Sequence, residues 1–297
     1  MITPQADSRQ PATWEANLLA GGQLVVLLVL SAILTLLLPL PAVIVTTQIL
    51  FIVPALIWSA ARRFPLRVIF RLQPISMSTA AWSLLIGVIC WPVAAGLSTL
   101  LDRLLSRIGP YPGIPLPENW VEVAAYALTF MVIAPLTEEP VYRGFILQAW
   151  LRRGALTGVL VSGILFGLVH SQIAPFLPIS VLGVVLGLLA YRSGSVLASI
   201  LAHASYNAVA TLFVVLPALQ RTPDGLIILA GGIALPLAVL AVWAFVRRGP
   251  QPTVPLPPAE TSSGVWRWIT LLGVLGLFGL MVMLEIFMRL NPLFAGM

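Results

Sequence analysis

Long apolar segments recur along the whole chain, each close to the length that a helix needs to cross a membrane. A hydrocarbon core about 30 Å thick needs roughly 20 apolar residues in a helix, because lipid leaves unpaired backbone groups unsatisfied. The sequence predicts nine such spans, near residues 19–38, 43–61, 80–101, 120–150, 155–171, 176–191, 196–217, 226–246 and 267–289. We therefore expect an all-α, polytopic transmembrane helical bundle of about eight to nine membrane spans.

The composition indicates that most of the protein surface faces the lipid bilayer. The 297 residues are 59% hydrophobic and 9% charged, and the mean hydropathy is +1.02. The net charge of +6 comes from Arg residues that are scattered as short pairs between apolar segments. A nucleic-acid interface would need basic residues clustered on a soluble face, so we exclude nucleic acid as a partner. The single cysteine, Cys90, excludes a disulfide framework and a multi-cysteine zinc site.

The arginines also predict the orientation of the chain, because short cytoplasmic loops are enriched in basic residues. If the loop at 62–71 is cytoplasmic, eleven arginines fall inside: Arg9, Arg62, Arg63, Arg67, Arg71, Arg152, Arg153, Arg192, Arg247, Arg248 and Arg267. Four fall outside: Arg103, Arg107, Arg221 and Arg289. We expect a multi-pass plasma-membrane protein whose N-terminus and Pro-rich linker at 249–264 are cytoplasmic.

The fourth predicted span contains charged residues that cost several kcal/mol at the bilayer centre unless they have a partner or a task. Glu139 and Arg143 are four residues apart and can pair across one helical turn. Glu138 projects about 100° away from Glu139 and stays available. Pro135 and Pro140 each remove a backbone donor, which predicts a kink or local opening that admits water beside the carboxylates.

Two further spans each contain one histidine, His170 in the fifth and His203 in the seventh. One histidine in a span is often a packing residue, but Asn207 follows His203 by four residues and shares its helix face. A rise of about 1.5 Å per residue brings Glu139, His170, His203 and Asn207 to a similar depth, which favours one common site. Ser205 has a different helical phase, so we expect it to be a packing residue.

These residues form three motifs on successive spans: Glu138-Glu139-x-x-x-Arg143, Phe166-x-x-x-His170 and His203-x-x-x-Asn207. In their order and spacing, the motifs resemble the CAAX prenyl protease 2 and bacteriocin-processing family of intramembrane proteases, abbreviated CPBP or Abi. The resemblance covers residues 119–217. It predicts a protease core there, between N-terminal transmembrane helices at 1–118 and C-terminal ones at 218–297.

The resemblance implies an intramembrane endopeptidase that hydrolyses a peptide or protein substrate entering from the membrane. It implies that Glu138 acts with His170 to activate water, and that His203 and Asn207 stabilise the oxyanion. Glu139, Arg143 and Phe166 would have supporting roles, with Glu139 and Arg143 organising the helix.

The sequence leaves the metal requirement open. Glu138, His170 and His203 are the ligand types of a catalytic zinc with one open position, as expected of a metalloprotease. Asn207 is a poor zinc ligand but a good hydrogen-bond donor, which favours a metal-free, glutamate-dependent mechanism. Both chemistries remain hypotheses at this point.

Two other classes of protein remain as alternatives. A proton-coupled transporter also needs Glu, His and Arg at mid-membrane depth. Transport, however, does not require an Asn four residues after His203 together with all three motifs. A non-catalytic membrane immunity protein with a decayed site is the other alternative, and the complete set of motif residues argues against decay.

Overall fold

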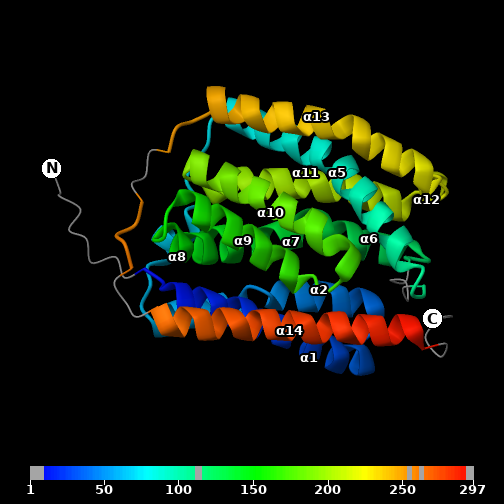
Figure 1. Cartoon of the computed structure of the whole chain (residues 1–297), viewed down its shortest axis with the longest axis horizontal. Coiled ribbons are helices and arrows are strands. Elements are labelled where there is room, and N and C mark those ends of the chain that lie inside the picture. Colours follow the sequence, from blue (N-terminus) through cyan, green and yellow to red (C-terminus); the bar gives the residue numbers. More distant parts are fainter. Residues whose placement is uncertain (1–9, 111–115, 253–255, 261–263, 292–297) are drawn as a thin grey trace.

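The computed structural model describes residues 10–110, 116–252, 256–260 and 264–291. Every regular element in these ranges is helical, and the long helices lie roughly side by side as a bundle (Figure 1). Arg9 and two stretches of the predicted linker, 253–255 and 261–263, lie outside the described residues. Residues 249–252 and 256–260 of the linker have no regular structure, as its proline content predicts, and helix α14 begins at Gly264.

Each predicted span corresponds to a helix or to consecutive helices. They are α1 (Thr13–Leu37), α2 (Leu40–Leu50) with α3 (Val53–Ala61), α5 (Met77–Leu105), the composite helix from α6 to α8 (Trp120–Leu151), α9 (Ala155–Val169), α10 (Ile173–Ser193), α11 (Val196–Val215), α13 (Asp224–Arg248) and α14 (Gly264–Leu290). Short helices α4 (Leu66–Phe70) and α12 (Pro217–Gln220) lie in connections. Eight of the helical stretches in the described ranges are long and apolar enough to cross a membrane. The chain is therefore an all-α, multi-pass membrane protein.

Helix α9 is shorter than the predicted fifth span. It ends at Val169, with His170 as its C-cap, and contains 15 residues. At about 1.5 Å per residue it is about 22 Å long, which is less than the hydrocarbon thickness. Among the described residues, the helices long and apolar enough to cross a membrane therefore number eight, and α9 is an additional, shorter apolar helix.

Four of the arginines that were predicted to lie on opposite sides of the membrane form ion pairs near the ends of the long helices. At the end nearer the N-terminus, the ion pairs are Arg62–Glu15 and Arg153–Glu260; at the other end they are Arg103–Asp224 and Arg289–Asp102. These ion pairs group Arg62 with Arg153 and Arg103 with Arg289, as in the predicted division. Which end faces the cytoplasm remains a prediction.

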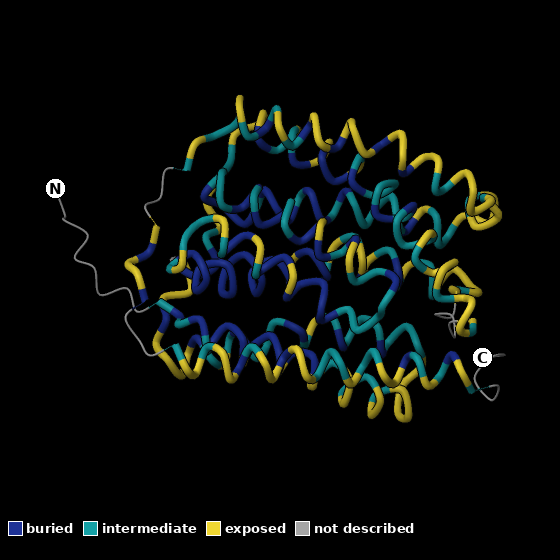
Figure 2. The backbone as a smooth tube through the Cα atoms, in the orientation of Figure 1, coloured by how far each residue is buried: buried dark blue, intermediate teal, exposed yellow. Residues whose placement is uncertain are grey.

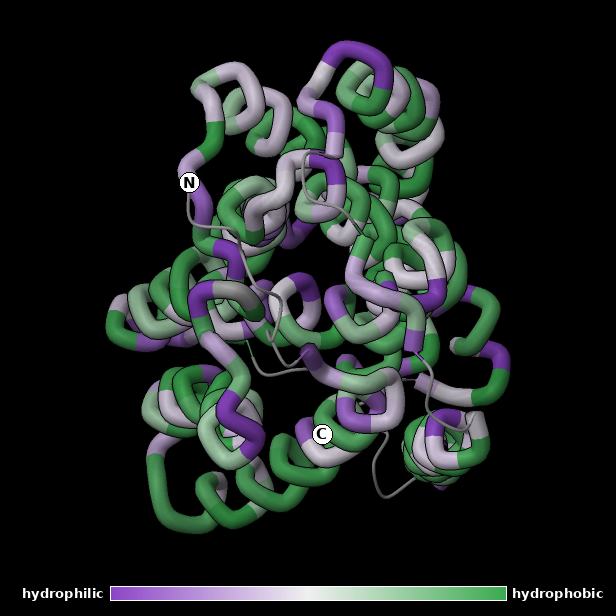
Figure 3. Tube along the Cα trace, turned by 90° about the vertical axis from the view of Figure 1, so that its left-hand side faces the viewer, coloured by the Kyte–Doolittle hydropathy of each residue, from purple (hydrophilic) through white to green (hydrophobic). Residues whose placement is uncertain are grey.

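Burial is concentrated in the central helices, while the outer helices are exposed along much of their length (Figure 2). Residues 137–151 are buried without interruption. By contrast, large hydrophobic side chains such as Leu229 and Val239 on α13 and Leu272 on α14 are exposed. Hydrophobic residues follow the outer helices as well as the inner ones (Figure 3), as expected for a surface that faces lipid.

Glycines allow the central helices to approach closely. A Cβ added to Gly87 on α5 would lie 2.0 Å from the carbonyl oxygen of Ala202 on α11. A Cβ on Gly183 of α10 would lie 2.7 Å from the carbonyl oxygen of Gly163 on α9. Small residues at helix contacts are typical of membrane bundles, because they let two backbones pack against each other.

Candidate active site

The composite fourth span widens on both sides of the carboxylates. Its order is α6 (Trp120–Leu128), the π-helix η1 (Thr129–Ile133), α7 (Ala134–Glu139), the π-helix η2 (Pro140–Ile146) and α8 (Leu147–Leu151). A proline cannot donate the backbone hydrogen bond that continues an α-helix, and π-helical turns accommodate the freed carbonyls. The local opening predicted from Pro135 and Pro140 therefore takes the form of two π-helical segments that bracket Glu138 and Glu139.

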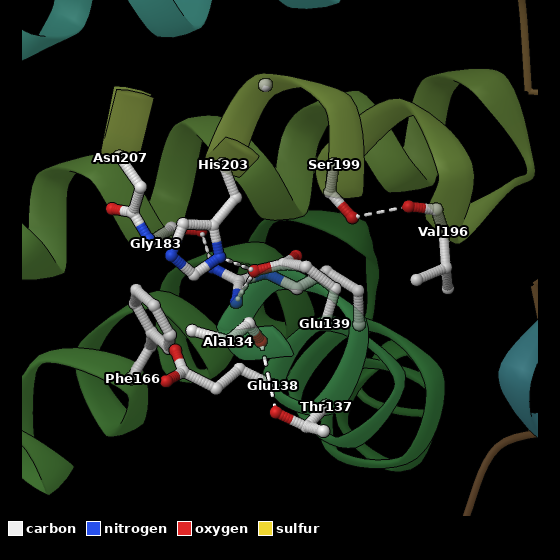
Figure 4. A network of polar contacts seen from close by, with 12 residues as sticks. Ala134, Thr137, Glu138, Glu139, Phe166, Gly183, Val196, Ser199, His203 and Asn207 are labelled. Atoms are coloured by element: carbon white, nitrogen blue, oxygen red, sulfur yellow. Dashed lines mark hydrogen bonds and ion pairs between the residues drawn. The ribbon is translucent and has the colours of Figure 1, made fainter. Parts of the chain in front are cut away.

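Glu139 is at the centre of a buried ionic network (Figure 4). Its Oε1 accepts a hydrogen bond from Arg143 Nη1 at 3.0 Å and another from His203 Nδ1 at 2.9 Å. The Glu139 and Arg143 side chains are fully buried, and Arg143 Nη2 donates to the carbonyl oxygen of Gly183 at 2.9 Å. The expected pair between Glu139 and Arg143 forms. The contact with His203 was not predicted, because His203 was assigned to the substrate carbonyl.

Phe166 joins the three motifs through ring contacts. The Arg143 guanidinium carbon lies 4.4 Å from the centroid of the Phe166 ring. The same ring makes edge contacts with His170 at 5.0 Å and with His203 at 5.6 Å between centroids. Phe166 thus contacts both histidines and the buried cation, and its supporting role stays a prediction.

Glu138 is buried, and its two carboxylate oxygens have different surroundings. Oε1 accepts a hydrogen bond from Gln48 Nε2 at 2.7 Å, whereas Oε2 is buried without a hydrogen-bond partner. Glu138 is therefore partly available, and not wholly so as predicted. The importance of Gln48 was not predicted from the sequence. Its amide lies within an apolar span, so, like the charged residues, it needs a partner or a task and could have been identified.

His170 lies where α9 ends and the chain turns towards α10. Its Nδ1 is 2.8 Å from the carbonyl oxygen of Phe166, and because a carbonyl can only accept, Nδ1 carries the proton. In the neutral ring, Nε2 then has a free lone pair. Ser171 follows with a φ of 57°, and Glu285 on α14 accepts from the Ile173 amide at 2.8 Å, which fixes the turn after His170.

Asn207 lies one helical turn beyond His203 on α11, and Figure 4 shows both side chains on the side of α11 that faces Glu138 and Phe166. One amide hydrogen of Asn207 is donated to the carbonyl oxygen of Phe130 at 2.7 Å. Asn207 and Phe130 also line a cavity of about 220 Å³ with Tyr126 and Thr211. Ser205 instead donates to the carbonyl oxygen of Leu84 on α5, in the packing role expected for it.

The residues suggested for zinc do not form a metal site in the described part of the chain. No three His, Cys, Asp or Glu side chains there are grouped so that they could hold a metal ion. The donor arrangement therefore does not fit a metal ion coordinated by Glu138, His170 and His203.

Comparison with known proteins identifies the segment that contains this site. Residues 120–209 match the family model described as type II CAAX prenyl endopeptidase Rce1-like. An uncharacterized 24.3 kDa protein of Escherichia coli is 32% identical over 98 residues, which cover 31% of this chain and 45% of that protein. The match thus spans less than half of this relative, and no solved structure matches the chain. All three motifs lie within the segment 120–209 that matches the Rce1-like family of type II CAAX prenyl endopeptidases.

Proposed function

We propose that this protein is an intramembrane endopeptidase in which Glu138 and His170 activate water without a metal. The observation on which the proposal depends is the asymmetry of Glu138. One of its oxygens is held by Gln48, and the other is buried without a partner, next to the motif residues of an endopeptidase-like family. A buried acceptor without a protein partner is a natural position for an ordered water.

The first chemical step is proton transfer from water to Glu138. Glu138 Oε2 and the free lone pair of His170 Nε2 accept hydrogen bonds from one water molecule and orient it. As the water oxygen attacks the scissile carbonyl carbon, its proton moves to Glu138, and the electron pair of the carbonyl moves to oxygen. Collapse of the tetrahedral intermediate breaks the carbon–nitrogen bond, and Glu138 returns the proton to the leaving amine.

His203 and Asn207 are suited to stabilise the oxyanion of that intermediate. The contact with Glu139 holds His203 through Nδ1, and the Nε2 that remains donates to the oxyanion when the ring carries a proton on both nitrogens. Asn207 has a second amide hydrogen besides the one donated to Phe130. Donors that are fixed in advance stabilise developing charge with little reorganisation, so Glu139 and Arg143 contribute by keeping His203 in place.

The substrate that we propose is an apolar peptide segment that enters from the bilayer. The surface of the cavity beside Asn207 is mostly apolar, with contributions from Leu116 and Val214. Apolar pockets with a few polar groups that fix orientation are typical of ligand sites. An apolar segment would therefore place its backbone carbonyl near Asn207 while its side chains stay out of water.

Comparison of peptide fragments in membranes tests this function. Membranes from cells that produce the wild-type protein should contain cleavage fragments that are absent with the Glu138→Gln variant. A matched control is Glu122→Gln, which removes a carboxylate in the first turn of α6, outside the three motifs. If wild-type and Glu138→Gln membranes gave the same fragments, the peptidase proposal would fail, and the proton-coupled transporter would become the first hypothesis.

A further inference from the structure

We infer that Gln48 is a positioning residue for catalysis, through which the N-terminal helices set the orientation of Glu138. The inference rests on the proposed function. It concerns a residue on α2, outside the segment that matches the family, so the motifs do not include it. Gln48 makes the shortest polar contact recorded for Glu138, at 2.7 Å between Nε2 and Oε1.

The orientation of the Gln48 amide follows from its two partners. Nε2 is 2.7 Å from Glu138 Oε1 and 3.2 Å from Thr137 Oγ1. The Thr137 hydroxyl donates its hydrogen to the carbonyl oxygens of Ile133 and Ala134, at 2.9 and 3.2 Å, so towards Gln48 it can only accept. Two acceptors face the same atom, which requires the NH₂ group of Gln48, and not its oxygen, to face the carboxylate.

This arrangement gives the two oxygens of Glu138 different tasks. Oε1 is held by a donor on another helix, and rotation of the carboxylate would break that bond. Oε2 is left without a partner and is the oxygen that the proposed mechanism assigns to water. A hydrogen bond to a charged carboxylate is stronger than one between neutral groups, so Gln48 is suited to fix the direction in which Oε2 points.

Helix α2 is a suitable support for this role. It packs against α6, η1 and α7, which are the parts of the composite helix that precede and include the carboxylates. At its end, the Phe51 carbonyl accepts a hydrogen bond from Gln23 on α1 at 3.0 Å. Gln23 therefore provides a matched control, because it is a buried glutamine that braces the same region of the chain without contacting Glu138.

The test compares Gln48→Met with Gln23→Met in the purified full chain. Methionine has nearly the length of glutamine but no donor. A misdirected base slows chemistry more than binding, so Gln48→Met should lower kcat about 10- to 100-fold with little change in KM, while Gln23→Met should retain kcat. Equal losses of kcat in both variants would mean that the amide acts through general packing, which would overturn the inference.

A double-mutant cycle separates action through Glu138 from an independent effect. In a Glu138→Asp background the shortened carboxylate no longer reaches Gln48, so adding Gln48→Met should reduce kcat by less than twofold more. A full additional loss of 10-fold or greater would show that Gln48 acts elsewhere.

Infrared spectroscopy gives a measurement that does not need proteolysis. The carboxylate band of Glu138 is obtained by subtracting the spectrum of Glu138→Gln from that of wild type, and it should shift when the same difference is taken in a Gln48→Met background. An unchanged band would overturn the contact itself. If the band shifts but the wild-type protein cleaves no substrate, the proposed function alone is refuted. If cleavage depends on Glu138 but Gln48→Met leaves kcat unaltered, the positioning role alone is refuted.

Discussion

The imidazole Nδ1 of His203 lies 2.9 Å from Oε1 of Glu139, the same oxygen that accepts a hydrogen bond from Arg143. This shared oxygen links the third motif to the first. The adjacent carboxylates of Glu138 and Glu139 therefore have different partners. Glu139 accepts two hydrogen bonds on Oε1 and is paired with the Arg143 cation, whereas Glu138 accepts one hydrogen bond, from the neutral amide of Gln48; Oε2 of each carboxylate is buried without a hydrogen-bond partner. Substitutions of the two residues should therefore have different consequences.

Glu139→Gln should destabilise the protein as well as inactivate it. The neutral amide would leave the fully buried Arg143 without a counter-charge, and breaking a buried pair in this way costs roughly 3–5 kcal/mol. The yield of monodisperse protein after detergent extraction should fall, together with the temperature at which it aggregates.

Glu138→Gln is the matched control, because it changes a neighbouring carboxylate that forms no ion pair with Arg143 in the structure. It should extract and unfold like wild type while losing proteolysis. A stable and fully active Glu139→Gln protein would contradict the structural role of Glu139.

The four proposed catalytic residues should behave as one unit. Groups that build a single transition state are strongly non-additive. Single alanine substitutions of Glu138, His170, His203 and Asn207 should each remove most of the proteolysis, and double substitutions should remove little more. Rates of fragment release from a purified substrate measure this. If two of the losses multiplied, those two residues would be acting in separate steps.

Much of this fold and part of this site could be predicted from the sequence, for identifiable reasons. The spans follow from length and hydropathy, and the Glu139–Arg143 pair follows from helical spacing, which is a local rule. The contacts from Gln48 to Glu138 and from Glu139 to His203 join different helices, and a single sequence does not fix which helix faces lie together. For the same reason, the bond from Asn207 to the backbone of Phe130 could not be predicted.

The end of α9 shows a second limit of prediction. Hydropathy continues through Val169, so the apolar pattern extended the fifth span to residue 171. The helix stops earlier because His170 turns its Nδ1 to the Phe166 carbonyl and Ser171 adopts a positive φ of 57°. Irregular backbone between apolar helices is tolerated where protein or water satisfies its polar groups, and here Glu285 on α14 accepts a hydrogen bond from the Ile173 amide.

Labelling of introduced cysteines tests the predicted orientation. In a Cys90→Ala background, a cysteine at Gln251 in the linker should resist a membrane-impermeant maleimide in intact cells and react after lysis. A cysteine at Thr222, in the connection between α12 and α13 at the other end of the bundle, should react in intact cells. The reverse pattern would mean that the arginine-rich end faces outward.

Gly87→Ala should destabilise the contact between α5 and α11. The added methyl would lie 2.0 Å from the Ala202 carbonyl oxygen and 2.1 Å from Ser205 Oγ, so the helices must separate. Overpacking of this kind costs about 1–3 kcal/mol. Gly232→Ala on α13 is the control, because its new methyl would meet nothing within 4 Å. Thermal unfolding in detergent should show a lower midpoint for Gly87→Ala alone, and equal midpoints would contradict the close approach.

Chelation tests the chemistry of the site, because the two mechanisms compatible with the sequence respond to it in opposite ways. The donors of Glu138, His170 and His203 are not grouped to hold an ion, so cleavage should continue at the same rate after treatment with EDTA or 1,10-phenanthroline. Zinc quantified in the purified, active protein should be far below one ion per chain. A zinc enzyme would instead lose activity on chelation and recover it when zinc is returned, since its water is activated by the metal. Recovery of this kind, abolished by His170→Ala, would replace the glutamate-dependent mechanism with a metal-dependent one.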